Sequence, residues 1–189
     1  MDKKVEGILL TGGKSQRMGA NKADILVNGV PQGVRVAREM AKVCSQVRIL
    51  GREPLPGFHF EEDRDSYEGP FVVLQRFKPV MPLVFVASCD MPAFHSEVIV
   101  GLMKSIGESQ VCTVEIDGFL QPLCSLYSAD CFARLVNFKS LTSWLISLSP
   151  TVLGQPELAA LGIDCRWVRS ANTPAEFEGI LASLHNESS

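Results

Sequence analysis

The segment "LLTGGKSQRMGANK", residues 9–22, combines two adjacent glycines with three cations, Lys14, Arg17 and Lys22. Adjacent glycines allow the backbone to approach a ligand closely and to turn its N–H groups toward it. Lysine and arginine side chains would add charge-assisted hydrogen bonds to phosphate oxygens. The segment therefore predicts a phosphate-binding loop, although a solvated turn with scattered charges would have a similar composition.

This loop follows neither of the two common glycine-rich nucleotide motifs. A P-loop has four residues between its first glycine and Gly-Lys-Ser, and Gly7 lies one position too early for that pattern. The dinucleotide pattern G-x-G-x-x-G is also missing from the segment. A nucleotide site here would have to be of another kind.

A second candidate site residue, Asp90, lies in "SCDMP", directly after the most apolar run of the chain. A carboxylate at the end of a buried strand is costly unless a cation neutralises it. Mg²⁺ takes one or two protein carboxylates and leaves positions for water and nucleotide phosphates. Asp90 is therefore predicted as a Mg²⁺ ligand, and the alternative is that it caps a helix beginning near Phe94 or His95.

The elements that must position these residues alternate between strands and helices. Apolar runs predict strands over 5–11, 46–50, 82–88, 110–116, 120–127 and 164–168, with a turn at Asp117-Gly118. Helical periodicity is found over 31–44, 71–77, 95–106, 128–138, 141–148 and 173–184. This order predicts an α/β fold of three layers around a mostly parallel sheet. Ligands of such sheets bind outside the carboxyl ends of the strands, where the loop and Asp90 both lie.

The composition is that of a globular protein that binds neither nucleic acid nor a membrane. The 189 residues fit a single domain, 1–189, with a frayed tail at 185–189. The net charge of −3 argues against a general affinity for nucleic acid. With no signal peptide and no apolar run long enough to span a bilayer, we expect a cytoplasmic protein. Its six cysteines form no C-x-x-C pair and are expected to be reduced and mostly buried.

Taken together, these stretches resemble the molybdenum cofactor guanylyltransferases of the MobA type, a family of nucleotidyltransferases. "LTGGKSQRMGANK" is similar to the family signature L-A-G-G-x-S-x-R-M-G-x-D-K. Further stretches resemble later family segments in the same order: "VNGVP", "EEDRDSYEGP", "SCDMP", "DGFLQPLCSLY" and "ANTPAEF". The resemblance covers nearly the whole chain and implies a three-layer, Rossmann-like nucleotidyltransferase fold.

The resemblance also implies a reaction and a set of site residues. It implies Mg²⁺-dependent transfer of GMP from GTP to molybdopterin, with release of pyrophosphate, and possible partners among proteins of cofactor biosynthesis or molybdoenzyme maturation. Asp90 would hold the metal and act in catalysis with Arg17 and Lys22. Substrate binding would involve Leu10, Thr11, Gly12, Gly13, Lys14, Lys22, Asp63 and Asn172. Asp63 would contact guanine, with Asp65 as an alternative.

The roles of Lys22 and Asn172 remain open at this stage. Lys22 could contact either the departing pyrophosphate or the α-phosphate. Asn172 would lie in the pterin pocket, expected to be apart from the phosphate loop. "NTPAEF" is also a good helix start, with Thr173 as its cap and Pro174 in the first turn. The pterin phosphate, with a second pKa near 6, would be ionised at neutral pH, so no general base is expected.

The chain departs from the family pattern at Thr11, Asn21, Gly51 and Val73. The usual residues there would be alanine, an acid, a base-contacting asparagine and glycine. These departures keep two alternatives open: a cytidylyltransferase of the same branch, and a nucleotide-binding relative without catalysis. The adjacent Gly12-Gly13 and the cysteine before Asp90 favour guanine over cytosine.

Overall fold

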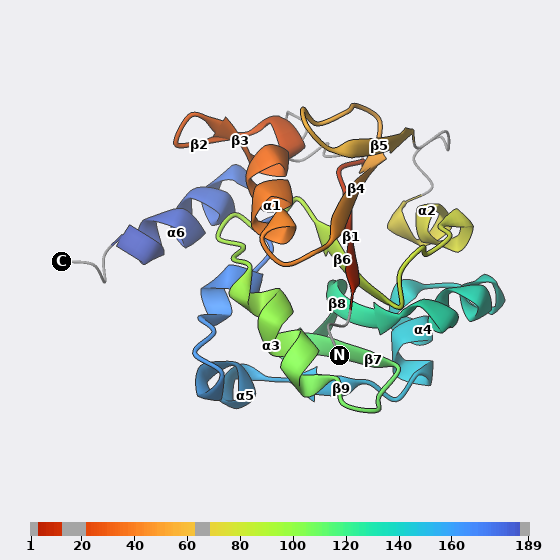
Figure 1. Ribbon diagram of the computed structural model, residues 1–189. Coiled ribbons are helices and arrows are strands. Elements are labelled where there is room, and N and C mark those ends of the chain that lie inside the picture. Colours follow the sequence, from red (N-terminus) through yellow and green to blue (C-terminus); the bar gives the residue numbers. More distant parts are fainter. Residues whose placement is uncertain (1–3, 13–21, 63–68, 186–189) are drawn as a thin grey trace.

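The computed structural model describes residues 4–12, 22–62 and 69–185 of the chain, and the statements below concern these residues. Their centre is a seven-stranded sheet in the order β5-β4-β1-β6-β8-β7-β9 (Figure 1). The strands are β1 (Val5–Leu10), β4 (Gln46–Gly51), β5 (His59–Glu62), β6 (Leu83–Ser88), β7 (Val111–Ile116), β8 (Phe119–Ser128) and β9 (Thr151–Leu153). Strand β8 is antiparallel to both of its neighbours, and the other pairs are parallel. The predicted mostly parallel α/β sheet is confirmed.

Helices cover both faces of this sheet, so the fold has three layers (Figure 1). Along β1, Leu9 packs into the cluster formed with α1 (Gln32–Ala41), α3 (Glu97–Ser105) and α5 (Gln155–Ala160). Its neighbours Ile8 and Leu10 point the other way. They pack against α2 (Pro70–Arg76), the 3₁₀ segment η2 (Ala129–Asn137) and α4 (Leu141–Ser147). A strand buried on both faces needs apolar residues at every position, which explains the continuous runs in β1 and β6.

Two tight hairpins have glycine where the backbone requires a positive φ. In the turn between β7 and β8, Asp117 has φ 53° and Gly118 has φ 81°, as expected for a two-residue hairpin loop. The predicted turn is confirmed. A second hairpin joins β2 (Leu26–Val27) to β3 (Val30–Pro31) through Asn28 and Gly29, with φ 52° and 79°. This hairpin was not predicted, although Asn-Gly is a strong turn signal.

The strand predicted over 164–168 is wrong, because this segment forms the 3₁₀ helix η3 (Cys165–Val168). The Asp164 carboxylate accepts a hydrogen bond from the Arg166 backbone N–H at 2.8 Å and also binds the Arg166 guanidinium. An aspartate that binds the backbone two residues later favours a turn over an extended strand. The local side-chain contacts therefore override the apolar pattern.

Several short elements were not predicted, and some helix ends differ. Strands β5 and β9 have only four and three residues, and helix α5 has six, fewer than two helical turns, so periodicity does not reveal them. The helix expected to reach residue 44 ends at Ala41, and the segment 128–138 is a 3₁₀ rather than an α-helix. Helix α6 (Pro174–His185) closes the described chain and includes His185, while 186–189 lie outside the described residues.

Helix α6 packs beside the β2–β3 hairpin, away from the main sheet (Figure 1). Phe177 of α6 and Val27 of β2 share a small buried cluster with Ala171. This contact joins the end of the chain to the segment that follows the glycine loop. In the described ranges, no helix is both long and apolar enough to cross a membrane.

The cysteines are free thiols, as expected, and five of the six are buried; Cys165 is half-buried. Burial raises the pKa of Cys44, Cys89 and Cys112 to about 12, and it also raises the pKa of Cys124 and Cys131. A raised pKa keeps these thiols protonated at neutral pH, and a protonated thiol is a poor nucleophile.

We therefore expect Ellman's reagent at pH 8 to react rapidly with at most one thiol of the native protein, Cys165. All six should react after denaturation in guanidinium chloride, because unfolding removes the burial that raises their pKa values. A Cys165→Ser variant should lose the rapid phase. Rapid reaction of two or more native thiols would contradict the burial of the other five.

Candidate functional site

The glycine loop follows the end of strand β1, and Asp90 follows the end of the neighbouring strand β6. Strand β1 pairs in parallel with β6, and Leu10 at the end of β1 is opposite Ser88 at the end of β6. Leu10 and Thr11 are buried, and Gly12 is exposed at the sheet edge. The segment that starts the predicted phosphate loop therefore lies beside the predicted metal ligand, at the edge where parallel sheets bind ligands.

The Asp90 carboxylate is directed toward the site and does not cap a helix. Its Oδ1 accepts a hydrogen bond from the Ser88 hydroxyl, and its Oδ2 lies 3.6 Å from the Lys22 ammonium nitrogen. The next helix, α3, begins only at Glu97. The alternative of Asp90 as a helix cap is therefore wrong. The Asp90 side chain is 23% exposed, so a ligand can reach it.

Lys22 joins three distant parts of the chain. Its Nζ donates to the Ala171 carbonyl at 2.8 Å and to Asn172 Oδ1 at 3.3 Å, and it faces Asp90. The Ala171 N–H in turn donates to the Asp90 carbonyl at 2.8 Å. The expectation that Asn172 lies apart from the phosphate loop does not hold for Lys22, because the chain returns to the carboxyl edge after η3; Gly13 and Arg17 lie outside the described residues.

The predicted helix start at Asn172-Thr173-Pro174 is confirmed. Thr173 Oγ1 accepts the Glu176 backbone N–H at 3.2 Å, and Glu176 Oε2 accepts the Asn172 N–H at 2.7 Å. Together these two bonds cap the start of α6, although Glu176 binds the N–H one residue before the Thr173 cap and not that of the cap itself. The capping uses the backbone of Asn172, so its side-chain amide is free to bind Lys22. Both predicted roles of the segment, helix start and site residue, are therefore compatible.

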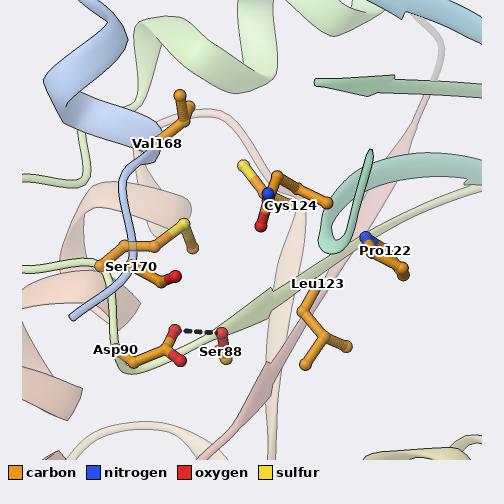
Figure 2. A pocket seen from close by; sticks show the side chains of 9 residues that line it. Ser88, Asp90, Pro122, Leu123, Cys124, Val168 and Ser170 are labelled. Atoms are coloured by element: carbon orange, nitrogen blue, oxygen red, sulfur yellow. Dashed lines mark hydrogen bonds between the residues drawn. The ribbon is translucent and has the colours of Figure 1, made fainter. Parts of the chain in front are cut away.

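A pocket of about 140 Å³ opens beside Asp90, between the end of β6, the start of β8 and the segment after η3 (Figure 2). Figure 2 shows the Asp90 and Ser170 side chains on one side of the opening and Leu123 and Pro122 on the other. The lining residues are Ser88, Asp90, Met91, Gln121, Pro122, Leu123, Cys124, Val168 and Ser170. The pocket is therefore contiguous with the Lys22–Asp90 pair.

The β8 wall of this pocket was not predicted from the residues themselves. The register of β7 and β8 shifts between Thr113 and Glu115, which leaves the backbone around Gln121 irregular. The Gln121 carbonyl accepts the Ser125 hydroxyl at 2.6 Å, and the Pro122 carbonyl accepts the Tyr127 hydroxyl at 2.9 Å. Side chains of the same strand thus satisfy carbonyls that the sheet leaves unpaired. The sequence signal was the proline within a strand, which often marks a bulge.

The backbone after Asp90 is clamped by helix α1. Gln32 Nε2 donates to the Met91 carbonyl at 2.7 Å, and Arg35 donates to the carbonyls of Met91 at 3.2 Å and Phe94 at 3.1 Å. Arg35 Nε also donates to Gln32 Oε1 at 3.0 Å, which fixes both side chains. Sequence reasoning missed this pair because its partners are 56 to 59 positions away.

Four predicted site residues lie outside the described residues: Gly13, Lys14, Arg17 and Asp63. The same holds for the alternative guanine ligand, Asp65, and for Asn21. Their roles stay predictions. Of the predicted site residues that the structure describes, Lys22, Asp90 and Asn172 are brought together, and Leu10, Thr11 and Gly12 lie at the adjacent strand end.

Comparisons with known proteins agree with this architecture. Residues 7–148 match the family model described as "MobA-like NTP transferase domain". A relative from a Nostoc species, named "Probable molybdenum cofactor guanylyltransferase", is 30% identical over 79% of this chain and 80% of its own length. A "Molybdenum cofactor biosynthesis bifunctional protein" from a Synechocystis species is 32% identical over 65% of this chain, and the match spans only 38% of that longer protein.

Among solved structures, one similar fold is "Molybdopterin-guanine dinucleotide biosynthesis protein A" from Archaeoglobus fulgidus. It covers 96% of this chain and 99% of its own, with a TM-score of 0.77 and 16% sequence identity. An identity this low establishes the fold and nothing finer. The chain therefore shares its overall fold with that structure.

The hydrogen bonds from Gln32 and Arg35 to the backbone after Asp90 lead to a prediction about stability. Replacing Arg35 by methionine keeps much of the side-chain bulk but removes its bonds to the carbonyls of Met91 and Phe94. We expect the free energy of unfolding to fall by about 1.5–3 kcal/mol, because hydrogen bonds from a charged donor contribute roughly this much. The free energy of unfolding is measured by urea denaturation followed by circular dichroism. The matched control is Arg38→Met on the exposed part of α1, which should change stability by less than about 0.5 kcal/mol.

Proposed function

The chain belongs to the family of MobA-like NTP transferase domains, and from this premise we propose that it transfers GMP from GTP to the phosphate of molybdopterin and releases pyrophosphate. The names of its relatives support guanine as the base and the molybdenum cofactor as the acceptor. The observation that carries the proposal is the meeting of Lys22, Asp90 and Asn172 beside an open pocket.

The strand order supports an arrangement of the two substrates along the carboxyl edge. The sheet places β4 on one side of β1 and β6 on the other, followed by β8. The family resemblance, in which position 51 at the end of β4 is usually a base-contacting asparagine, implies that a triphosphate over the loop after β1 would have its nucleoside toward β4. Its reacting end would lie toward Asp90 after β6. The pocket walled by β8 would then receive the acceptor, on the side of the phosphates opposite to the nucleoside.

The donor set at Asp90 fits Mg²⁺ bound together with a nucleotide. Within the described ranges, no group of three or more histidine, cysteine, aspartate or glutamate side chains could hold a metal by itself. Mg²⁺ is commonly held by one or two carboxylates and completes its shell with water and substrate phosphates. Asp90, partly exposed at the strand end, would be that carboxylate. When bound there, Mg²⁺ would neutralise charge on the phosphate oxygens.

The proposed reaction is an in-line displacement at the α-phosphorus. An oxygen of the acceptor phosphate forms the new P–O bond, and the bond to the bridging oxygen of the β-phosphate breaks. The leaving pyrophosphate takes the electron pair. The acceptor phosphate is already ionised at neutral pH, so the protein needs to position the reactants and stabilise charge rather than remove a proton.

Lys22 would supply part of this charge stabilisation. Its ammonium group has three donors, of which two are directed to Ala171 and Asn172. The remaining donor faces the Asp90 carboxylate at 3.6 Å, longer than a hydrogen bond. A phosphate oxygen entering between Lys22 and Asp90 would complete the coordination of the lysine. Lys22 would therefore bridge the nucleotide to the Asn172 segment on the acceptor side.

The proposal is tested by pyrophosphate release with molybdopterin, Mg²⁺ and a panel of GTP, CTP and ATP. We expect GTP to be used at least about tenfold better than the other two nucleotides, since a pocket that hydrogen-bonds one base discriminates against others. Equal or better use of CTP would contradict the guanine assignment. Failure to release pyrophosphate with any nucleotide would favour a relative without catalysis.

A second prediction concerns Asp90. We expect Asp90→Asn to lower the rate of pyrophosphate release by on the order of a hundredfold or more, because it removes the charge that would hold the metal. The thermal midpoint should change little, since asparagine can still accept the Ser88 hydrogen bond. Asp130→Asn, at an exposed acid on η2, is the matched control and should keep full activity. An active Asp90→Asn variant would eliminate Asp90 as the metal ligand.

A further inference from the structure

The Thr11 hydroxyl is a buried polar group without a partner. Thr11 follows β1 at the carboxyl edge and is only 6% exposed, and its Oγ1 makes no hydrogen bond within the structure described. Its backbone N–H is satisfied by the Leu50 carbonyl at 3.0 Å. Buried hydroxyls are normally hydrogen-bonded, because losing the bonds to water without replacement costs free energy. An unpaired one beside a ligand site points to a ligand as its missing partner.

Gly51 reserves the space in which this hydroxyl lies. A Cβ atom built at Gly51 would be 2.0 Å from Thr11 Oγ1 and 3.3 Å from the Gly12 backbone nitrogen. Real Cβ contacts are essentially never shorter than 3.0 Å. The backbone of Gly51 does not have a positive φ, so glycine is needed here for space and not for conformation. Any side chain at position 51 therefore excludes the present placement of the Thr11 hydroxyl.

We infer that the Thr11 hydroxyl hydrogen-bonds the nucleoside portion of the bound nucleotide and that glycine at position 51 leaves the space that this hydroxyl needs. This inference rests on the proposed function. The pair lies between β1 and β4, on the side of β1 away from β6 and Asp90. The Thr11 hydroxyl is directed toward Gly51 at the end of β4, the side that the proposed arrangement gives to the nucleoside, so the ligand atoms next to it would be those of the sugar or base. A threonine hydroxyl can donate and accept, and both parts of a nucleoside offer partners.

The test is Thr11→Val, which keeps the shape of the side chain and removes the hydroxyl. Titration calorimetry with Mg²⁺ and GTP should show affinity about three- to tenfold weaker, the effect of losing one neutral hydrogen bond. The thermal midpoint of the ligand-free protein should stay the same or rise, because an unpaired buried hydroxyl has been removed. Thr11→Ser, which retains a hydroxyl, should bind GTP within about twofold of the parent protein.

Thr151→Val is the matched control for these measurements. Thr151 begins β9 at the opposite side of the sheet, and its Oγ1 is 2.7 Å from the Ser109 hydroxyl. The same substitution there breaks a hydrogen bond that exists in the ligand-free protein. It should lower the thermal midpoint and leave GTP affinity unchanged. Thr11→Val is thus expected to weaken GTP binding without lowering the thermal midpoint, and Thr151→Val to lower the thermal midpoint without weakening GTP binding.

Three ligand probes locate the contact. If the partner is the ribose 2′-hydroxyl, 2′-deoxyGTP should bind the parent protein and Thr11→Val equally. If the partner is the guanine 2-amino group, ITP, which lacks that group, should bind the parent protein and Thr11→Val equally. Either result supports the inference, as does a loss that persists with both analogues but is absent with tripolyphosphate. An equal loss with tripolyphosphate would overturn it, because the hydroxyl would then contact phosphate.

A double substitution tests the role of Gly51. Gly51→Ala should lower the thermal midpoint of the parent protein, because its Cβ collides with the Thr11 hydroxyl. In a Thr11→Ala background the same change should lower it less. Equal decreases in both backgrounds would overturn the spatial coupling. If the parent chain binds no GTP, the proposed function itself fails; if it binds GTP and Thr11→Val binds equally well, only the assignment of Thr11 fails.

Discussion

The site depends on one backbone hydrogen bond, from the Ala171 N–H to the Asp90 carbonyl. It fastens the segment after η3 to the end of the central strand β6. Lys22 then binds the Ala171 carbonyl and faces the Asp90 carboxylate. The Ala171 carbonyl and Asn172, which bind Lys22, are thereby held beside the Asp90 carboxylate. Because the three segments come from the beginning, middle and end of the chain, the site can form only when the whole sheet has assembled.

Strand β8 explains why a pocket opens beside this junction. It is the one strand of the described sheet that runs against the others, so its beginning lies beside the end of β6. A parallel strand would bring its carboxyl end to this edge, followed by a loop into a helix. The antiparallel strand instead brings the irregular Gln121–Cys124 backbone to the same place, where hydroxyls of Ser125 and Tyr127 satisfy its carbonyls. A hydrogen-bonded strand therefore faces Asp90 where a loop would otherwise lie.

The sequence predicted those parts of the fold in which local chemistry decides the structure. Continuous apolar runs predicted β1 and β6, and Asp117-Gly118 predicted the hairpin turn, because each signal acts over a few residues. The strand expected at 164–168 failed because Asp164 binds its own backbone. The contact of Lys22 with Asn172 could not be predicted, because it depends on how the chain returns to the sheet edge after η3. Resemblance suggested both residues but gave no distance between them.

Departures from a family pattern also depend on distances between residues that the sequence does not give. Position by position, Thr11 and Gly51 are two separate deviations, each of which puts activity in doubt. In the structure they are one feature, since the threonine hydroxyl fills the space that a side chain at Gly51 would occupy. By the family resemblance, position 51 usually carries a base-contacting asparagine, so the proposed contact of Thr11 would move polar chemistry from the end of β4 to the end of β1. Two departures that meet in space are therefore one structural change, and their effect on the site has to be considered together, because neither residue could be replaced by a larger one without moving the other.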